Sequence, residues 1–112
     1  MLATSASQIP PFSVRVVHDR DEVVVELTGE LDIASADELE REIRELRADG
    51  VACVVIDLRG VDFLDSTGLR TLISLRNAAK RAGHGLVVVP GPPRVQRIFE
   101  LTATRSLFDW RA

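Results

Sequence analysis

Cysteine and histidine are scarce in this chain. Among its 112 residues there is one cysteine, Cys53, and there are two histidines, His18 and His84. A single thiol cannot form an internal disulfide, and its place within an apolar run indicates a small core residue rather than a nucleophile. The spacing of these three residues matches no metal-binding motif. We therefore expect no disulfide, no metal centre and no other cofactor, and we expect a reducing compartment.

Long hydrophobic runs and excess positive charge are also missing. No apolar segment approaches the ~20 residues that span a bilayer, and the first residues lack the basic and apolar blocks of a secretory signal. The formal net charge is −3, which argues against nucleic acid as the main partner. These absences predict a cytoplasmic protein that binds neither a membrane nor nucleic acid directly.

The rest of the composition suits a small globular domain. Hydrophobic residues make up 46 % of the chain, which is enough for a packed core without a disulfide or a metal. The length favours one domain. We expect a flexible N-terminal arm over residues 1–11, which are small and polar and end in two prolines, and a single folded domain over residues 12–112.

Strand and helix patterns alternate along this domain. The segments with strand patterns are 12–17, 22–28, 51–58, 84–91 and 105–110. The segments with amphipathic helical periodicity are 36–50, 68–83 and 92–102. The predicted order is β-β-α-β-α-β-α-β, and its βαβ steps imply parallel neighbouring strands with right-handed crossovers. The fold class is therefore α/β.

The first helix has the clearest predicted boundaries. Ser35 and Glu38 have the spacing of a capping box, in which each side chain bonds the other residue's backbone N–H. Gly50 is well placed to end the helix. We therefore expect Ser35 to cap this helix through its hydroxyl.

The start of the second helix carries an unusual set of polar residues. Asp65, Ser66, Thr67 and Gly68 follow directly after an apolar run. A structural cap is the favoured interpretation, because a carboxylate or hydroxyl there accepts a hydrogen bond from a free backbone N–H. Yet one cap suffices, and Gly68 costs roughly 1 kcal/mol of helix stability relative to alanine. A hydroxyl at a helix N-terminus is also a favourable place for a phosphate group, and a glycine lets another backbone approach closely.

Two catalytic interpretations of this junction are weak. A hydrolase nucleophile elbow needs a glycine two residues before the serine, and Leu64 occupies that position. Neither histidine has a spacing that suggests a catalytic partner. In the pattern of aspartic proteases a glycine follows the Ser or Thr, and here Thr67 intervenes. We therefore predict that the chain is not an enzyme.

Three segments together resemble a known family. They are LTGELD (27–32), VVIDLRGVDFLDSTGLRTL (54–72) and PPRVQRIFELT (92–102). In this order and setting they resemble the STAS domain, and more narrowly the bacterial anti-sigma factor antagonists. The resemblance covers about residues 12–110 and implies a mixed sheet of four or five strands with helices mainly on one face.

The resemblance also implies a function for the junction. In the family, the serine that follows the aspartate is the phosphoacceptor, which corresponds to Ser66. The partner is an anti-sigma factor that is also a serine kinase. The unmodified antagonist binds this kinase and frees the sigma factor, phosphorylation of Ser66 ends the complex, and a metal-dependent serine phosphatase resets the cycle.

The family's docking surface implies a set of partner-binding residues here. They are Glu30, Leu31, Asp32, Ile33, Asp65, Thr67, Gly68, Leu69 and Arg70. We expect Gly68 and Leu69 to offer an apolar contact, and Asp32 and Asp65 to complement a basic partner surface.

The chain departs from the family pattern in two places. Ala103 and Thr104 stand where the family commonly has a glycine and an apolar residue. Family members generally have a fourth helix after the last strand. We therefore expect either that this part of the sheet is less covered here, or that the N-terminal arm, a further segment or a second copy in a homodimer covers it. The alternative function is a constitutive STAS subunit without phosphorylation, such as an accessory of a lipid-transport ATPase or a scaffold in a stress-sensing assembly.

Overall fold

A single mixed sheet forms the centre of the molecule. The structure is a computed structural model that describes residues 12–111, so the predicted arm over residues 1–11 lies outside the described part. The strands are β1 (Phe12–Asp19), β2 (Glu22–Leu31), β3 (Cys53–Leu64), β4 (Gly85–Val89) and β5 (Asp109–Trp110). They lie in the order β1-β2-β3-β4-β5. The β1 strand is antiparallel to β2, and the other neighbours are parallel.

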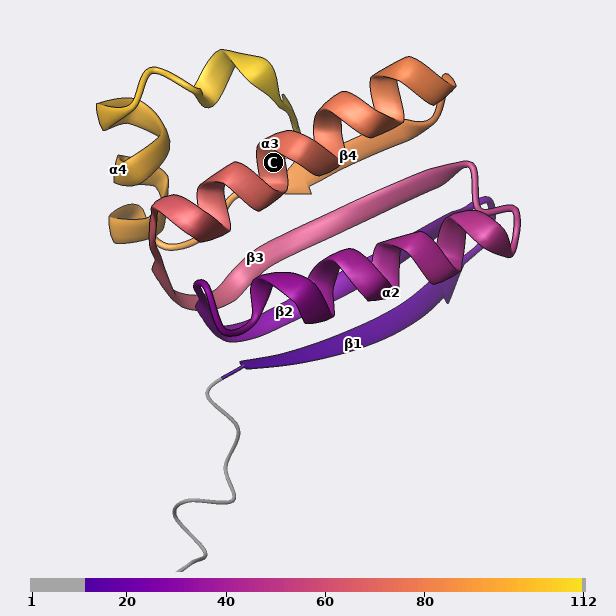
Figure 1. Cartoon of the computed structure of the whole chain (residues 1–112), viewed down its shortest axis with the longest axis horizontal. Coiled ribbons are helices and arrows are strands. Elements are labelled where there is room, and N and C mark those ends of the chain that lie inside the picture. The colour runs from indigo at the N-terminus through magenta and orange to yellow at the C-terminus, as the bar shows by residue number, and fades with distance from the viewer. Residues whose placement is uncertain (1–11, 112) are drawn as a thin grey trace, which may run out of the picture.

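Helices follow the strands as the sequence predicts. They are α2 (Ala36–Ala48), α3 (Ser66–Ala82) and α4 (Pro93–Leu101), with a short 3₁₀ turn over Arg105–Leu107. The α2 and α3 helices lie side by side over one face of the sheet, and α4 contacts β3 at the end of the molecule where α3 starts (Figure 1). The predicted element order and the α/β class are confirmed. Among the described residues, no helix is long and apolar enough to cross a membrane.

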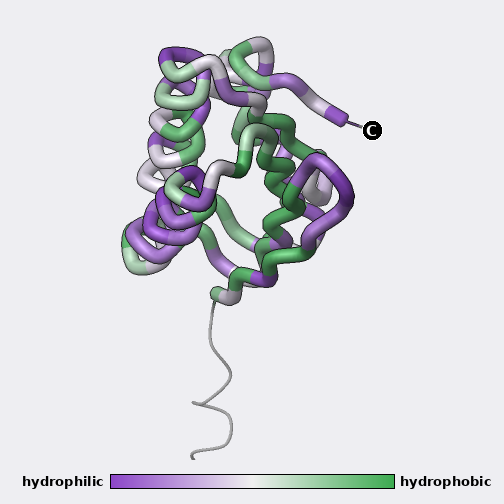
Figure 2. The backbone as a smooth tube through the Cα atoms, turned by 90° about the vertical axis from the view of Figure 1, so that its right-hand side faces the viewer, coloured by the Kyte–Doolittle hydropathy of each residue, from purple (hydrophilic) through white to green (hydrophobic). Residues whose placement is uncertain are grey.

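The core lies between the sheet and these two helices. Alternate residues of β2 point into it, including Val23, Val25 and Leu27. The helices contribute Leu39 and Leu72, among others, which are also fully buried. Each such side chain adds about 1.5–3 kcal/mol to the hydrophobic stabilisation of the fold. In Figure 2 the hydrophobic colour gathers in the strands, whereas the helices alternate between hydrophobic and hydrophilic residues.

Aromatic side chains close the end of the sheet beyond β4. The ring of Phe99 in α4 packs edge-on against Phe108 and Trp110, with centroids 5.5 and 5.0 Å away. The predicted last strand is real but short, and Trp110 belongs to it. At the start of β3, Cys53 is only partly buried, so the expectation of a core thiol holds in part.

Three strands end later than the sequence pattern predicts: β1 continues to Asp19, and β2 and β3 extend further. The β2 strand reaches Leu31, and β3 continues past residue 58 to Leu64. Their pairing shifts register twice, which lets the ladder continue, and it ends with Leu31 opposite Leu64. As a consequence, both strands end at the same edge of the sheet, and the turns that lead into α2 and α3 are neighbours.

Candidate functional site

The two predicted parts of the site meet at the carboxyl ends of β2 and β3. The backbone N–H of Asp65 donates to the carbonyl oxygen of Leu31 over 3.3 Å, which ties the two strand ends together. Figure 1 shows α2 and α3 starting from this same end of the molecule. The tertiary structure therefore joins segments 30–33 and 65–70, which are separated by the whole of α2 and β3.

Asp65 caps the α3 helix. Its Oδ1 accepts a hydrogen bond from the Gly68 N–H at 2.8 Å, and its extended backbone conformation is that of an N-cap residue. Its backbone carbonyl then accepts the first intrahelical bond, from the Leu69 N–H at 3.0 Å. Of the capping candidates that the sequence offers, the structure uses the carboxylate.

Ser66 is left free by this arrangement. It is the first residue of α3 and is exposed to solvent. Within residues 12–111 its hydroxyl makes no hydrogen bond, and the N–H groups of Ser66 and Thr67 precede the first bonded N–H of the helix. An exposed hydroxyl therefore stands beside two unused backbone donors at the positive end of a helix dipole.

Gly68 and Leu69 face the interior, which corrects the expectation that they offer an apolar contact surface. Both residues are buried. A Cβ atom on Gly68 would lie 2.2 Å from the carbonyl oxygen of Leu31. The backbone that approaches this glycine is therefore the chain's own β2 strand, and the glycine is needed for α3 to start this close to it.

The turn after β2 uses the same residue types in another way. Asp32 Oδ1 accepts hydrogen bonds from the N–H groups of Ala34 and Ser35 at 3.0 and 3.2 Å. The buried Ser35 hydroxyl donates to the carbonyl of Glu30 at 2.7 Å and accepts from the N–H of Asp32 at 2.9 Å. The predicted capping box with Glu38 is therefore wrong, because the Ser35 hydroxyl turns back toward the strand instead of bonding the helix.

The predicted site residues differ in exposure. Those exposed are Glu30, Ile33, Ser66 and Arg70, those half-buried are Asp32, Asp65 and Thr67, and those buried are Leu31, Gly68 and Leu69. The side chains of the exposed and half-buried residues can contact a partner protein. The buried residues hold the two turns in place from below.

Two exposed apolar side chains belong to the strand ends and turns that meet at this site, and sequence reasoning missed one of them. Ile33 is 74 % exposed and Phe63 is 50 % exposed. Phe63 pairs with Glu30 across the β2–β3 ladder, one residue before the buried Leu64. The strand was expected to end at residue 58. Beyond that point the burial of β3 does not alternate with period two, because Asp62 and Phe63 are both exposed between the buried Val61 and Leu64, so no local pattern marks Phe63. We call the exposed and half-buried residues here the Ser66 surface: Glu30, Asp32, Ile33, Phe63, Asp65, Ser66, Thr67 and Arg70.

The geometry gives Ser66 no catalytic partner among the described residues. His84 follows the far end of α3, and the helix of 17 residues is about 25 Å long. His18 lies near the β1–β2 turn, at the other end of the strands. No group of three or more His, Cys, Asp or Glu residues within 12–111 is arranged to hold a metal ion. The site can present a hydroxyl to another protein, and it has no nearby imidazole that could activate that hydroxyl.

One buried carboxylate lies outside the Ser66 surface. Asp57 is buried in β3, and both its oxygens accept hydrogen bonds from the Arg59 guanidinium at 2.8–3.1 Å. This hydrogen bonding lowers the pKa of Asp57 below its ordinary value, against the opposing effect of burial. A carboxylate held ionised in this way is a structural ion pair rather than a poised acid or base.

Fold and site together define a class of protein: a small α/β domain that presents an exposed serine at a helix start, next to the ends of two parallel strands. The family model of the STAS domain matches residues 13–111. The chain belongs to the STAS domain family.

Known relatives agree with this assignment. The anti-sigma-B factor antagonist of Staphylococcus aureus is 31 % identical over 83 residues, which cover 74 % of this chain and 77 % of that protein. The crystal structure of an anti-sigma factor antagonist from Mycobacterium paratuberculosis has a TM-score of 0.75 and 31 % identity, and the match covers 88 % of this chain and 84 % of that one. The Bacillus cell fate determinant SpoIIAA in its phosphorylated form shares the fold, with a TM-score of 0.68 at 16 % identity over 89 % of this chain and 92 % of that chain.

Proposed function

We propose that this chain is an anti-sigma factor antagonist. In its unphosphorylated form it binds an anti-sigma serine kinase and frees the sigma factor, and phosphorylation of Ser66 switches it off. The observation that carries the proposal is the free, exposed Ser66 hydroxyl beside the Asp65 cap. The names of the relatives from Staphylococcus and Mycobacterium support the same function.

A phosphate on Ser66 suits this position without refolding the domain. The unused N–H groups of Ser66 and Thr67 and the positive end of α3 favour an added negative charge. The cap does not depend on the modified oxygen, because Asp65 bonds the Gly68 N–H. We therefore expect both forms of the protein to have the same fold, so the switch acts on the surface.

The same phosphate opposes binding to a partner. It adds negative charge to a surface that already contains three carboxylates, Glu30, Asp32 and Asp65, against one cation, Arg70. When a phosphate is desolvated in a packed interface without a matching cation, the cost is several kcal/mol. Since 1.4 kcal/mol is tenfold in affinity, this suffices to dissociate a complex.

The Ser66 surface indicates the kind of partner surface that fits it. Exposed apolar side chains at Ile33 and Phe63 are suitable interface anchors, and the surrounding carboxylates favour a basic rim on the partner. Leu31, Gly68 and Leu69 act from inside by fixing the turns. A serine phosphatase that restores the hydroxyl has access to Ser66 because this residue is exposed. We place this cycle in the cytoplasm.

The first experiment maps the phosphorylation site. The chain is incubated with ATP and the anti-sigma serine kinase of the same organism, and the product is mapped by mass spectrometry. We expect one phosphate on Ser66 and none in Ser66→Ala. Ser74→Ala is the matched control, because Ser74 is also exposed on α3 and its replacement leaves the reaction unchanged. Equal modification of Ser66→Ala and the unaltered chain contradicts the proposal.

The second experiment separates the switch from a constitutive subunit. Kinase affinity is measured for the unaltered chain, Ser66→Asp and Phe63→Ala. We expect Ser66→Asp to bind at least tenfold more weakly than the unaltered chain because of the added charge. We expect a similar loss of affinity for Phe63→Ala because an apolar interface anchor is missing. Leu101→Ala is the control, since Leu101 is 71 % exposed on α4 outside the Ser66 surface. Unchanged affinity of Ser66→Asp favours the constitutive STAS subunit instead.

A further inference from the structure

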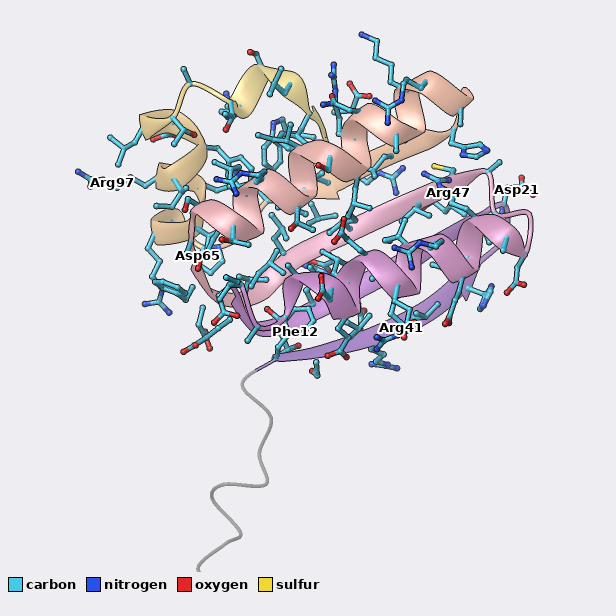
Figure 3. All side chains as sticks on the ribbon, in the orientation of Figure 1. Phe12, Asp21, Arg41, Arg47, Asp65 and Arg97 are labelled. Atoms are coloured by element: carbon cyan, nitrogen blue, oxygen red, sulfur yellow. The ribbon has the colours of Figure 1, made fainter. Side chains whose placement is uncertain are left out.

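A second surface of the molecule carries charge that the chain itself does not neutralise. A groove of about 470 Å³ lies between the second halves of α2 and α3, and this volume is within the range of small-molecule sites. Figure 3 shows Asp65 and Arg47 toward opposite ends of the molecule, so the groove is remote from the Ser66 surface. Nothing in the proposed switch uses it.

Apolar side chains from both helices line the groove. The α2 helix contributes Ile43, and α3 contributes Leu75, Ala78, Ala79 and Ala82. The three alanines leave room where larger residues would close the gap between the helices. A ligand here would bury its apolar part against these side chains.

Arginines surround this apolar lining. Arg44, Arg47 and Arg81 line the groove together with His84, and Glu40 is the one carboxylate among the lining residues. Among the described residues, none of these three arginines forms an ion pair, although Arg15, Arg59, Arg94 and Arg111 each do. The groove therefore has at least two more positive than negative charges.

Arg47 is held in place rather than free in solvent. Its guanidinium donates to the carbonyl oxygens of Val51, Ala52 and Gly85 at 3.0–3.1 Å. Partial burial lowers the pKa of this guanidinium from its usual value, yet arginine stays charged in proteins. A fixed and partly desolvated cation without a counter-ion is the feature that an anionic ligand would complete.

We propose that this groove binds a small amphiphilic anion, which is a carboxylate or phosphate head on an alkyl chain. The head lies near Arg44, Arg47 and Arg81, and the chain lies along the alanines of α3. Charge complementarity selects the anion, and the apolar lining selects the chain. The proposal is independent of the proposed switch, because no residue of the Ser66 surface takes part.

Ligand titrations on the full chain test both parts of the ligand. Dissociation constants are measured by chemical-shift titration with decanoate, decyl phosphate, decanol, octanoate and inorganic phosphate. We expect decanoate and decyl phosphate to bind at the groove, octanoate to bind roughly tenfold more weakly than decanoate because two methylenes are lost, and decanol and phosphate to bind at least tenfold more weakly than decanoate. Decanol as tight as decanoate, or shifts outside residues 40–47 and 74–84, overturns the proposal.

Variants then locate the site without disturbing the structural Arg47. The double variant Arg44→Gln/Arg81→Gln weakens the binding of decanoate by about tenfold. Ala78→Phe fills the groove and weakens decanoate binding at least as much. The matched controls are Arg41→Gln/Arg97→Gln and Ala48→Phe, at exposed helix positions that do not line the groove. Circular dichroism confirms that each variant is folded. Equal decanoate affinity in the two double variants contradicts the assigned site, whatever the outcome of the kinase experiments.

Discussion

The turns that lead into α2 and α3 use the same two residue types for opposite purposes. After β2, the Ser35 hydroxyl is buried and bonds the Glu30 carbonyl and the Asp32 N–H. After β3, Asp65 makes the cap, and Ser66 is exposed with its hydroxyl free. The position of the serine relative to the helix start decides the difference: Ser35 precedes α2 as its N-cap residue, whereas Ser66 is the first residue of α3.

This comparison separates a structural serine from an available one. A hydroxyl that satisfies buried backbone groups cannot be modified without loss of the turn. A hydroxyl one position further along is accessible and is not needed by the fold. The following predictions test this separation, in order of decreasing expected effect on the free energy of unfolding, which is measured by chemical denaturation.

Gly68→Ala should have the largest effect. The new Cβ would lie 2.2 Å from the Leu31 carbonyl oxygen, so α3 must move away from β2. We expect a loss of about 3 kcal/mol, which exceeds the ~1 kcal/mol that alanine gains as a helix former. Gly50→Ala is the control, because its Cβ meets no atom within 4 Å and only its positive φ of 88° matters, at about 1 kcal/mol. Equal losses for both variants would show that Gly68 does not set the contact between α3 and β2.

Ser35→Ala should have the next largest effect. It leaves the Glu30 carbonyl and the Asp32 N–H without their partner at a buried position. We expect a loss of about 2 kcal/mol. Ser66→Ala is the matched variant and should stay within about 0.5 kcal/mol of the unaltered chain, as surface changes usually do. Equal losses of stability in Ser35→Ala and Ser66→Ala would contradict the difference between the two serines.

Asp65→Ala should cost about 1 kcal/mol through the lost N-cap. Asp65→Asn keeps a side-chain oxygen that can accept from the Gly68 N–H, so it should cost a few tenths of a kcal/mol. If Asp65→Ala is neutral, the Ser66 hydroxyl has taken over the cap, and it is not as free as the structure indicates.

Ala103→Gly extends the comparison to a helix end and should have the smallest effect. Ala103 has a positive φ of 59° after α4, and the N–H groups of Ala103 and Thr104 bond the carbonyls of Glu100 and Phe99. This is the geometry that favours glycine. We expect a gain of about 0.5 kcal/mol, because relief of strain exceeds the extra entropy of an unfolded glycine. Ala78→Gly within α3 is the control and should lose about 1 kcal/mol.

Local patterns predicted most of the fold. Alternation in 22–28 and helical periodicity in 36–50 and 68–83 follow from burial on one face, so they are visible in the sequence. The ends of β2 and β3 were missed because the register shifts there interrupt the alternation and only pairing between strands extends them. Phe63 was missed from the site for the same reason.

The sequence by itself determined the order of elements, the apolar faces and the presence of a serine at a strand-to-helix junction. Only the tertiary structure decided which polar side chains do the capping, that Gly68 serves the chain's own packing, and that the two junctions lie at one edge. The physical reason is that periodicity reports burial along one element, whereas a hydrogen bond or a close contact depends on atoms that the fold brings together from distant segments.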